Sequence, residues 1–252
     1  MNRIRPVLAL AQRELRSWFI TPVGYVYLVF FVALSNGLFF VLNRFFDMGQ
    51  VSMRGWFGML PWVYLFFVPA FSMGLWSEEK GRGTIETLLT LPLSEWQAVL
   101  GKFLAGLGFL ALSLACTFTV PYTLSQVGNL DWGATLASYF GAFLMGAAFL
   151  AVGLLVSSLT RNQVVAFILS ITVLFVMIMI GHPQMIMMLS THFAHLSFFS
   201  GVVHWLSWSG LITHFGNISR GVIDTRDVIY SAVVVFVLLH LNVHLLRTQR
   251  WK

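Results

Sequence analysis

The chain has 252 residues, of which 58% are apolar and 10% are charged. Soluble domains carry about 25% charged residues, and a mean hydropathy of +0.82 excludes a soluble domain with one anchor and indicates an all-α polytopic membrane protein. The formal charge of +6 does not indicate nucleic-acid binding, because Lys and Arg stand in short clusters at the ends of apolar runs, as topology signals do.

The apolar residues extend from one end of the chain to the other, and no polar stretch is long enough to fold by itself. We therefore expect one membrane domain over residues 1–252. The single cysteine, Cys116, cannot form an intrachain disulfide. It lies in an apolar run, where we expect a small buried or lipid-facing residue.

Residues 1–21 are basic and amphipathic. Opposite their arginines we expect an apolar stripe formed by Val7, Leu8, Leu15, Trp18 and Phe19. We interpret this segment as an amphipathic helix that lies on the inner membrane surface. The alternative is a plain basic flank before the first span.

Six apolar runs reach the length of about 20 residues that a helix needs to cross the hydrocarbon core. The predicted spans cover residues 22–42, 57–76, 103–125, 135–157, 163–181 and 228–246. The fourth span repeats small residues four positions apart, at Ala142 and Gly146 and again at Ala147 and Ala151. Such spacing lets helices approach closely, although small residues are also common in membrane helices generally.

The stretch WSEEKGRGTIETLLTLPLSEWQAVLGK, residues 76–102, carries seven of the 24 charged side chains. Its glycines break the helix that leaves the second span, and Thr84 is placed to cap a short amphipathic helix that Pro92 ends. Ser94 then caps a helix that runs into the third span. An uncovered amphipathic helix favours docking of a protein partner; the alternative is a solvated loop whose apolar residues rest on the membrane.

The apolar run over residues 162–219 is too long for one span and barely long enough for three. Residues 182–219 contain five histidines together with Ser, Gly and Pro183, which suits an interfacial or re-entrant segment. Two full spans would also move the basic C-terminus to the outer side. We therefore expect one span, followed by an extracytoplasmic interfacial or re-entrant segment over residues 182–227.

The distribution of Lys and Arg predicts the orientation, because positive charge marks the cytoplasmic side. With six spans, the segments on the side of both termini hold Arg3, Arg5, Arg13, Arg16, Lys80, Arg82, Lys102, Arg161, Arg247, Arg250 and Lys252. The opposite segments hold only Arg44, Arg54, Arg220 and Arg226. We therefore expect cytoplasmic termini and a cytoplasmic loop over residues 77–102.

This loop closely resembles the segment after the second span of type-2 ABC (ABC-2) export permeases. The shared pattern is carried here by Glu78, Glu79, Lys80, Gly83, Thr84, Glu86, Leu88, Leu89, Pro92, Gly101 and Lys102. Residues 146–170 and 214–230 look like the gliding-motility type of these permeases, and nitrous-oxide-reductase maturation permeases are close relatives. The resemblance covers nearly the whole chain and is weakest over residues 182–213.

The resemblance implies one half of an ATP-driven exporter in the bacterial cytoplasmic (inner) membrane. Residues 1–21 would be the elbow helix, and the 77–102 loop would hold the coupling helix that docks on a separate ATPase subunit, present in two copies. A second copy of this chain or a related permease would complete the membrane part. The expected coupling residues are Glu78, Glu79, Lys80, Gly83, Thr84, Glu86, Leu88, Leu89 and Pro92.

The chain lacks the GxxxxGK[ST] phosphate loop, so we expect no enzyme activity here and expect ATP and Mg to bind the partner ATPase. No cofactor or metal site is predicted in this chain. His240 and His244 have a spacing that can ligate metal, but no nearby acid supports them, and helix packing is the favoured interpretation. For the histidines of residues 182–219, a metal or pH-sensing patch is the alternative to an interfacial role.

Charged residues gather just before the last span, at Arg220, Asp224, Arg226 and Asp227. One interpretation is an outer gate or a docking site for an extracytoplasmic accessory protein. The alternative, which we favour, is a capped helix start in which an acid of the first turn interacts with the helix dipole.

Apart from two histidines, the predicted spans contain no ionisable residue, which argues against a proton- or sodium-coupled transporter. The Phe- and Met-rich composition favours a lipid-like or amphipathic cargo; the alternative is that these residues simply face lipid. Two other classes of function stay open: a non-transporting anchor or assembly factor of a cell-surface or motility complex, and an integral membrane enzyme. The enzyme requires acids or a nucleophile at membrane depth, which the predicted spans do not supply.

Overall fold

The structure is a computed structural model that describes residues 5–42, 52–84, 93–192 and 208–250. Its helices are α1 (Arg5–Ile20), α2 (Pro22–Leu42), α4 (Arg54–Ser72), α5 (Gly74–Gly81), α7 (Glu95–Cys116), α8 (Thr119–Val127), α9 (Trp132–Ser157), α10 (Gln163–Gly181), α11 (Pro183–His192), α13 (Leu211–Ile218) and α14 (Thr225–Arg250). Six stretches are long and apolar enough to cross a membrane, which confirms the predicted all-α fold with six spans.

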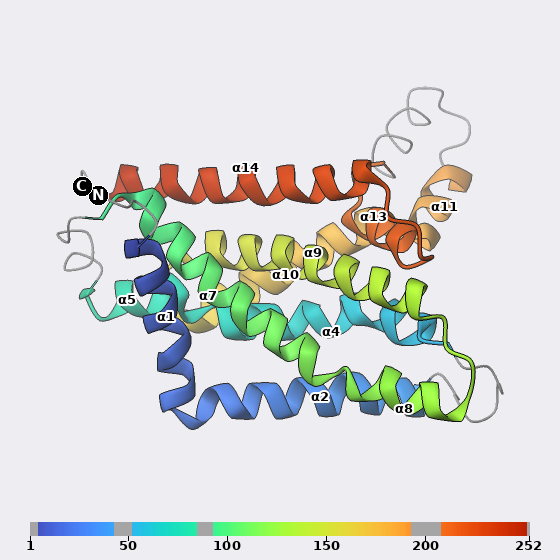
Figure 1. Ribbon diagram of the computed structural model, residues 1–252. Helices are drawn as coiled ribbons and strands as arrows, with labels where there is room; N and C mark the ends of the chain where they lie inside the picture. Colours follow the sequence, from blue (N-terminus) through green and yellow to red (C-terminus); the bar gives the residue numbers. More distant parts are fainter. Residues whose placement is uncertain (1–4, 43–51, 85–92, 193–207, 251–252) are drawn as a thin grey trace.

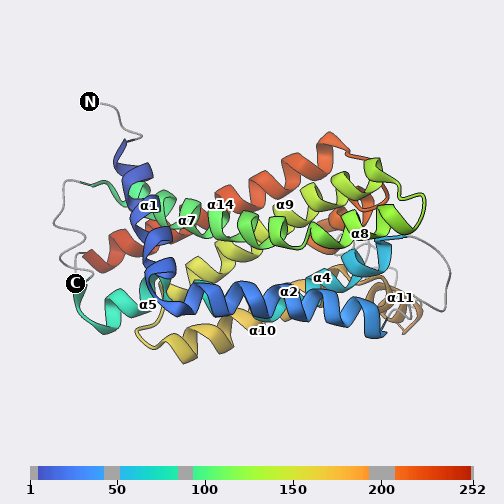
Figure 2. The same ribbon diagram turned by 60° about the horizontal axis from the view of Figure 1, so that its bottom comes forward.

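The long helices run roughly along one direction, and α1 crosses them at one end of the bundle (Figure 1). We call this end, around Glu79 and Lys102, the terminal end, because α1 begins and α14 ends there. We call the opposite end, around His214, the far end. Figure 2 shows the same separation, with α5 at the terminal end and α8 and α11 at the far end.

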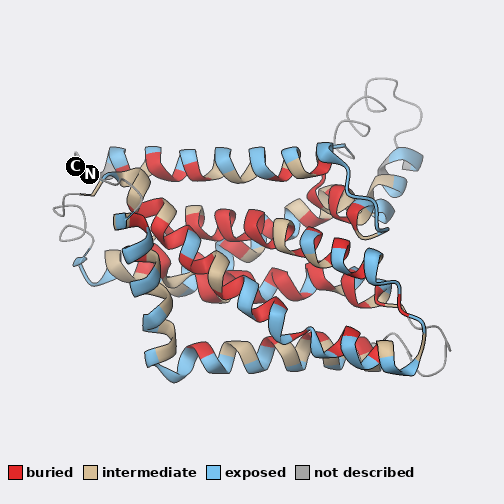
Figure 3. Ribbon diagram, in the orientation of Figure 1, coloured by how far each residue is buried: buried red, intermediate tan, exposed pale blue. Residues whose placement is uncertain are grey.

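Helix α9 forms the centre of the bundle and packs against α4, α7, α10, α13 and α14. Figure 3 shows its middle turns as buried. A Cβ atom on Gly146 would lie 2.6 Å from Leu110, and one on Gly153 would lie 2.1 Å from the Ser72 hydroxyl. The small residues of this span therefore do allow neighbouring helices to approach closely.

The second span bends at Met73, where α4 ends and α5 begins. A helix start leaves backbone N–H groups without a partner in their own helix. The Ser157 hydroxyl of α9 accepts hydrogen bonds from two of them, those of Trp76 (3.0 Å) and Ser77 (3.1 Å). It also donates to the Met73 carbonyl (2.7 Å). Helix α9 thus fixes the bent end of the second span.

The third span consists of two helices rather than the one continuous helix predicted over residues 103–125. Helix α7 already begins at Glu95, where Ser94 and Gln97 form a capping box with hydrogen bonds of 3.3 and 3.0 Å. The predicted cap at Ser94 is therefore confirmed. The break before α8 is held by Thr117, whose hydroxyl donates to a carbonyl of α7 and lies 3.1 Å from the Tyr139 hydroxyl.

Helix α1 packs across α7 and covers it with Val7 and Leu10, which are 8% and 5% exposed. Leu8, another member of the predicted stripe, does not take part in this packing and is 56% exposed. Further along α1, Trp18 packs edge-on against Phe109 at 5.1 Å between ring centroids.

Helices α11 and α13 have 10 and 8 residues, too few to cross a bilayer core of about 30 Å. Both lie at the far end (Figure 1). The structure therefore agrees with a short-helix segment before the last span. Two of the five histidines of this segment, His195 and His204, lie outside the described residues.

Candidate functional site

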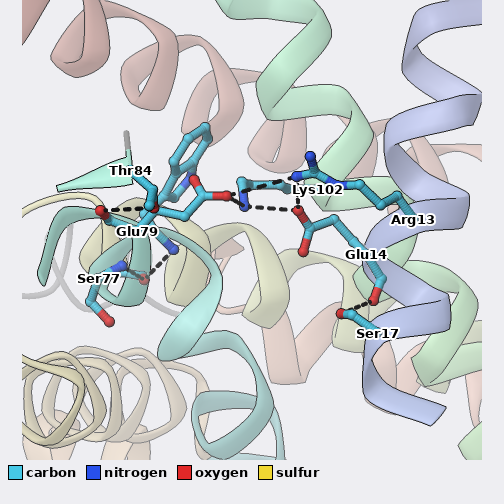
Figure 4. Close-up of polar contacts among 9 residues, drawn as sticks. Arg13, Glu14, Ser17, Ser77, Glu79, Thr84 and Lys102 are labelled. Atoms are coloured by element: carbon cyan, nitrogen blue, oxygen red, sulfur yellow. Dashed lines mark hydrogen bonds and ion pairs between the residues drawn. The ribbon is translucent and has the colours of Figure 1, made fainter. Parts of the chain in front are cut away.

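An ion cluster around the buried Lys102 joins α1, α5 and α7 at the terminal end (Figure 4). The Lys102 ammonium lies 2.8 Å from Glu79 Oε1 and 3.3 Å from Glu14 Oε1. Arg13 lies 2.9 Å from the same Glu14 oxygen and 4.0 Å from Glu79. The Trp76 ring faces the ammonium, 4.9 Å from its centroid. We call these five residues the terminal ion cluster; its charges cancel.

Three local features bring these side chains together. The capping box at Ser94 fixes where α7 begins. It therefore also fixes the position of Lys102 along the helix axis. Next to this lysine, a Cβ on Gly101 would lie 2.7 Å from the Leu10 side chain. The missing side chain therefore lets α1 approach α7, and Glu14, on the same helix face as Leu10, reaches the ammonium.

Burial makes the charges of the cluster depend on one another. The Lys102 side chain is 1% exposed, and an ammonium removed from water is stable only with close anionic partners. Burial by itself raises the pKa of the Glu14 carboxyl, but Lys102 and Arg13 outweigh that effect and lower the pKa below its usual value of 4.5. The three helices are thus tied by charges that need one another.

Two polar atoms of the cluster have no hydrogen-bond partner among the described residues. They are the Glu79 Oε2 atom and the Trp76 Nε1 atom, and both are buried. Buried polar atoms in proteins are almost always paired. The described part of the chain therefore does not complete this cluster by itself.

The end of α5 packs against the connection between α9 and α10. The Lys80 ammonium donates a hydrogen bond to the Ser158 carbonyl, and a Cβ on Gly81 would lie 3.0 Å from the Arg161 carbonyl. A movement of α5 therefore acts on the ends of α9 and α10 as well as on α4.

The turn after α5 requires a glycine. Gly83 has φ = +72°, a left-handed conformation that other residues adopt at a cost. Thr84 donates its hydroxyl hydrogen back to the Glu79 carbonyl at 3.3 Å, so this hydroxyl ties the turn to α5. Whether Thr84 also caps a following helix stays a prediction, because that helix falls on residues 85–92, outside the described residues.

The expected coupling residues divide into four groups. Glu79 and Lys80 point into the protein, as described above. Glu78 points outward, where it is 41% exposed and pairs with Arg82 at 2.6 Å. Gly83 and Thr84 form the turn after α5, as described above. The last four members lie outside the described residues; they are Glu86, Leu88, Leu89 and Pro92. The coupling role of the whole set stays a prediction.

A cavity of about 550 Å³ lies beside the terminal ion cluster, between α1, α2, α4 and α5. Glu14, Glu79 and Lys102, together with Glu78 and Arg82, form its charged lining. Aromatic rings such as Trp18 and Tyr27 are also part of the lining, next to small and polar residues. The cavity therefore presents a charged and an apolar wall to the same space.

The four charged residues expected before the last span fall into two groups, three exposed and one buried. Arg220, Asp224 and Arg226 are exposed, and the Asp224 carboxylate accepts a hydrogen bond from the Arg226 backbone at 2.9 Å, as a cap does. Asp227 is 4% exposed and pairs with His214. The capped helix start is thus observed for Asp224, whereas Asp227 takes part in a buried contact. A role of this set in gating or docking stays a prediction.

The described histidines do not form a metal centre with acids or cysteine. No group of three or more His, Cys, Asp or Glu side chains is close enough to hold a metal ion within residues 5–42, 52–84, 93–192 and 208–250. His240 lies against the Trp96 ring at 5.6 Å between centroids. This contact agrees with the packing interpretation of that histidine.

Sequence reasoning missed Glu14 as a member of the site. The signal was present, because Glu14 is the one acid of a basic helix and stands with Val7, Leu10 and Trp18 on the face that packs against α7. An acid on an apolar helix face indicates a buried cationic partner. The partner, Lys102, was part of the matched pattern but was not assigned a role.

Comparison with known proteins identifies the family. The ABC-2 family transporter protein domain matches residues 57–246, which run from the first turn of α4 to the last turns of α14 and include Glu79, Lys102 and Asp227. No curated protein matches the chain at a significant level. The match spans well over half of the sequence and agrees with the six membrane-spanning helices. The chain belongs to the ABC-2 family of transporter proteins and is a multi-pass membrane permease subunit.

Proposed function

We propose that this permease receives the motion of a separate ATPase subunit through residues 76–102, and that the terminal ion cluster transmits it to the membrane helices. The observation that carries the proposal is the position of Lys102. It binds Glu79, at the start of the coupling loop, and Glu14, on the elbow helix α1. A force on the loop therefore reaches two elements at once.

The connections of these elements to the spans are short and stiff. Only Thr21 separates α1 from α2, and a Cβ on Gly24 would lie 2.6 Å from the Trp18 carbonyl. On the other side, Ser157 holds α5 to α9 through the hydrogen bonds at the Met73 bend. Displacement of α5 would thus move the first, second and fourth spans together. Packed helices transmit such shifts because their cores have discrete arrangements.

The terminal end is the cytoplasmic side in this proposal. It carries the exposed Arg5, Arg13 and Arg16 on α1 and Arg82 after α5, and positive charge marks the cytoplasmic side. The complex would contain two ATPase subunits and a second permease, either this chain or a related one, in a bacterial cytoplasmic membrane. ATP and Mg would be bound by the ATPase.

The cargo in this proposal is lipid-like or amphipathic and is exported. The cavity beside the terminal ion cluster supports this class, because it combines a charged wall at Glu79 and Lys102 with aromatic rings. An amphipathic molecule fits such a mixed surface better than an ion does. Within the ABC-2 family, we propose that this chain belongs to the gliding-motility type of permease.

The test is purification of the tagged protein from native membranes in mild detergent, with identification of every copurifying chain. We expect a stoichiometric ATPase, which Leu89→Asp removes. Glu79→Gln should retain the ATPase but lower its cargo-dependent or permease-dependent turnover. Glu78→Gln is the matched control for the cluster, because Glu78 is 41% exposed and pairs with Arg82 rather than with Lys102; we expect turnover like that of the wild type.

Recovery of this chain alone, or with only envelope proteins, would contradict the proposal and favour the alternative of a non-transporting anchor or assembly factor. Equal ATPase turnover in Glu79→Gln, Glu78→Gln and wild type would leave the ATPase partner in place but remove the cluster from the coupling path.

A further inference from the structure

A buried histidine joins α13 to the first turn of α14 at the far end. His214 Nδ1 lies 2.5 Å from Asp227 Oδ1, and His214 Nε2 lies 2.9 Å from the Trp208 carbonyl oxygen. The side chains of His214 and Asp227 are 7% and 5% exposed. The contact links elements that the chain separates by the turn at residues 219–224.

The geometry determines how many protons the pair holds. A carbonyl oxygen only accepts, so the Nε2 atom of His214 carries a hydrogen. The 2.5 Å contact at Nδ1 also needs a hydrogen between nitrogen and oxygen, whereas a neutral imidazole has one N–H in total. The pair therefore holds one proton more than a neutral histidine with a carboxylate, either on the imidazole or on Asp227.

The neighbouring elements offer no other charge to replace that proton. On α14, the Tyr230 ring stacks on His214 at 4.1 Å, but its hydroxyl donates to the Ser209 carbonyl. On α9 the one titratable side chain is Tyr139, which pairs with Thr117, and α10 contains no titratable residue.

The charged residues of the nearby turn are directed to solvent. Arg220, Asp224 and Arg226 are all exposed. The proton of the His214–Asp227 pair is therefore not replaced by another charged side chain among the described residues packed around it.

We propose that the His214–Asp227 pair is a proton-dependent latch that holds α13 against α14 and closes the far end of the bundle. When the pair opens to water, an exposed histidine gives up its extra proton near pH 6.5. Above that pH, closing takes up a proton. By linkage, the ratio of closed to open molecules falls as the pH rises, by up to about tenfold per pH unit.

A pair that has lost its extra proton could in principle stay closed with one hydrogen bond fewer. The surroundings of Asp227 explain why we expect it to open instead. Without that proton, one ring nitrogen of His214 directs a lone pair at an oxygen atom, that of the Trp208 carbonyl or that of Asp227. The Oδ2 atom of Asp227 also lacks a partner among the described residues. An unpaired carboxylate is costly when buried. This inference concerns the far end and does not depend on how the ATPase is coupled or what the cargo is.

The test is hydrogen–deuterium exchange of the full-length protein in phosphatidylcholine nanodiscs between pH 5.5 and 8.5. The readout is the protection factor of amides in α13 and the first turn of α14, after correction for the intrinsic pH dependence of exchange. We expect constant protection below about pH 6.5 and a decrease of up to about tenfold per pH unit above it. Amides in the middle of α9 serve as the internal reference and should not change.

The double variant His214→Gln with Asp227→Asn replaces the pair by two neutral amides that can still hydrogen-bond. We expect it to keep protection without the pH dependence. His182→Gln is the matched control, because His182 also lies at the far end but outside this contact, and it should keep the wild-type dependence.

Constant protection of the wild type up to pH 8.5, or an equal slope in the double variant, would overturn the latch. Loss of the slope in His182→Gln would assign it to the other histidine and would also overturn the proposal. If the double variant does not fold, the wild type and His182→Gln still decide the question.

Discussion

Each end of the bundle contains a contact between largely buried ionisable side chains, but the chemistry of those side chains differs. At the terminal end, Lys102 lies between Glu14 and Glu79. At the far end, His214 lies against Asp227 and a backbone carbonyl. An ammonium keeps its proton across neutral pH, whereas an imidazole releases it near pH 6.5.

This difference shows that similar burial leads to different behaviour. A permanent charge with several partners gives a connection that holds under all ordinary conditions, which suits an element that transmits force. A titratable charge gives a connection whose strength depends on the solution. The experiments below test this contrast, from the largest expected effect to the smallest.

Replacement of the central cation should have the largest effect. Lys102→Met leaves Glu14 and Glu79, which are 14% and 18% exposed, beside each other without their shared cation. Breaking a fully buried pair by removing one partner costs about 3–5 kcal/mol, which is the upper end expected here. The apparent free energy of unfolding in detergent, and the yield of monodisperse protein, should both fall. Arg247→Met, at a loose 3.9 Å contact to Glu95, is the control. Unchanged stability of Lys102→Met would show that the cluster does not hold α1 and α5.

Removal of the acid at the far end should cost less. Asp227→Ala leaves the Nδ1 atom of His214 without its partner, at a cost of about 1–3 kcal/mol at acidic pH. At pH 8 the cost should be smaller, because the imidazole can release the extra proton. Unfolding measured at pH 5.5 and pH 8 checks this, and an equal loss at both values would contradict a titratable contact.

Acid should weaken the terminal end, opposite in sign to the far end. Glu14 has a pKa lowered below 4.5 in the folded protein, against burial, by Lys102 and Arg13. A lowered pKa contributes stability that is present above pH 4.5 and is lost as the pH falls through the folded value. Unfolding measured from pH 7 to pH 3 should show this loss, and Glu14→Gln should lack that part of it. An identical acid profile in the variant would remove Glu14 from the cluster.

The smallest effect is expected where the charges face solvent. Arg82→Met removes the 2.6 Å pair with Glu78, in which both side chains are more than a third exposed. Such pairs contribute about 0–1 kcal/mol, so thermal unfolding should barely change. A loss as large as that of Lys102→Met would show that the turn after α5 is held more tightly than its exposure indicates.

Much of the fold followed from the sequence because membrane spans have a simple physical signature. About 20 apolar residues with charges at their ends predict a crossing helix without knowledge of its neighbours, and all six spans were found this way. The cap at Ser94 was equally local. The bend at Met73 was not predicted, because the partner of its free N–H groups, Ser157, comes from another helix.

The candidate sites were predictable only in part. The matched pattern pointed to Glu79 and Lys80, but it could not say that Glu78 faces solvent while Glu79 binds Lys102. Glu14 was missed although its place on an apolar face was readable. Asp227 was grouped with its exposed neighbours, because nothing in the local sequence placed it beside His214, thirteen positions earlier.

The sequence by itself determined that this protein has six membrane spans with its charges gathered at the span ends, since hydropathy and charge asymmetry act on each segment separately. The tertiary structure alone decided which of those charges are buried and with whom. Burial depends on the approach of helices that are distant in the chain, such as α1 to α7 across Gly101 and α13 to α14 at Asp227. The cost of removing a charge from water then makes each of these pairings necessary.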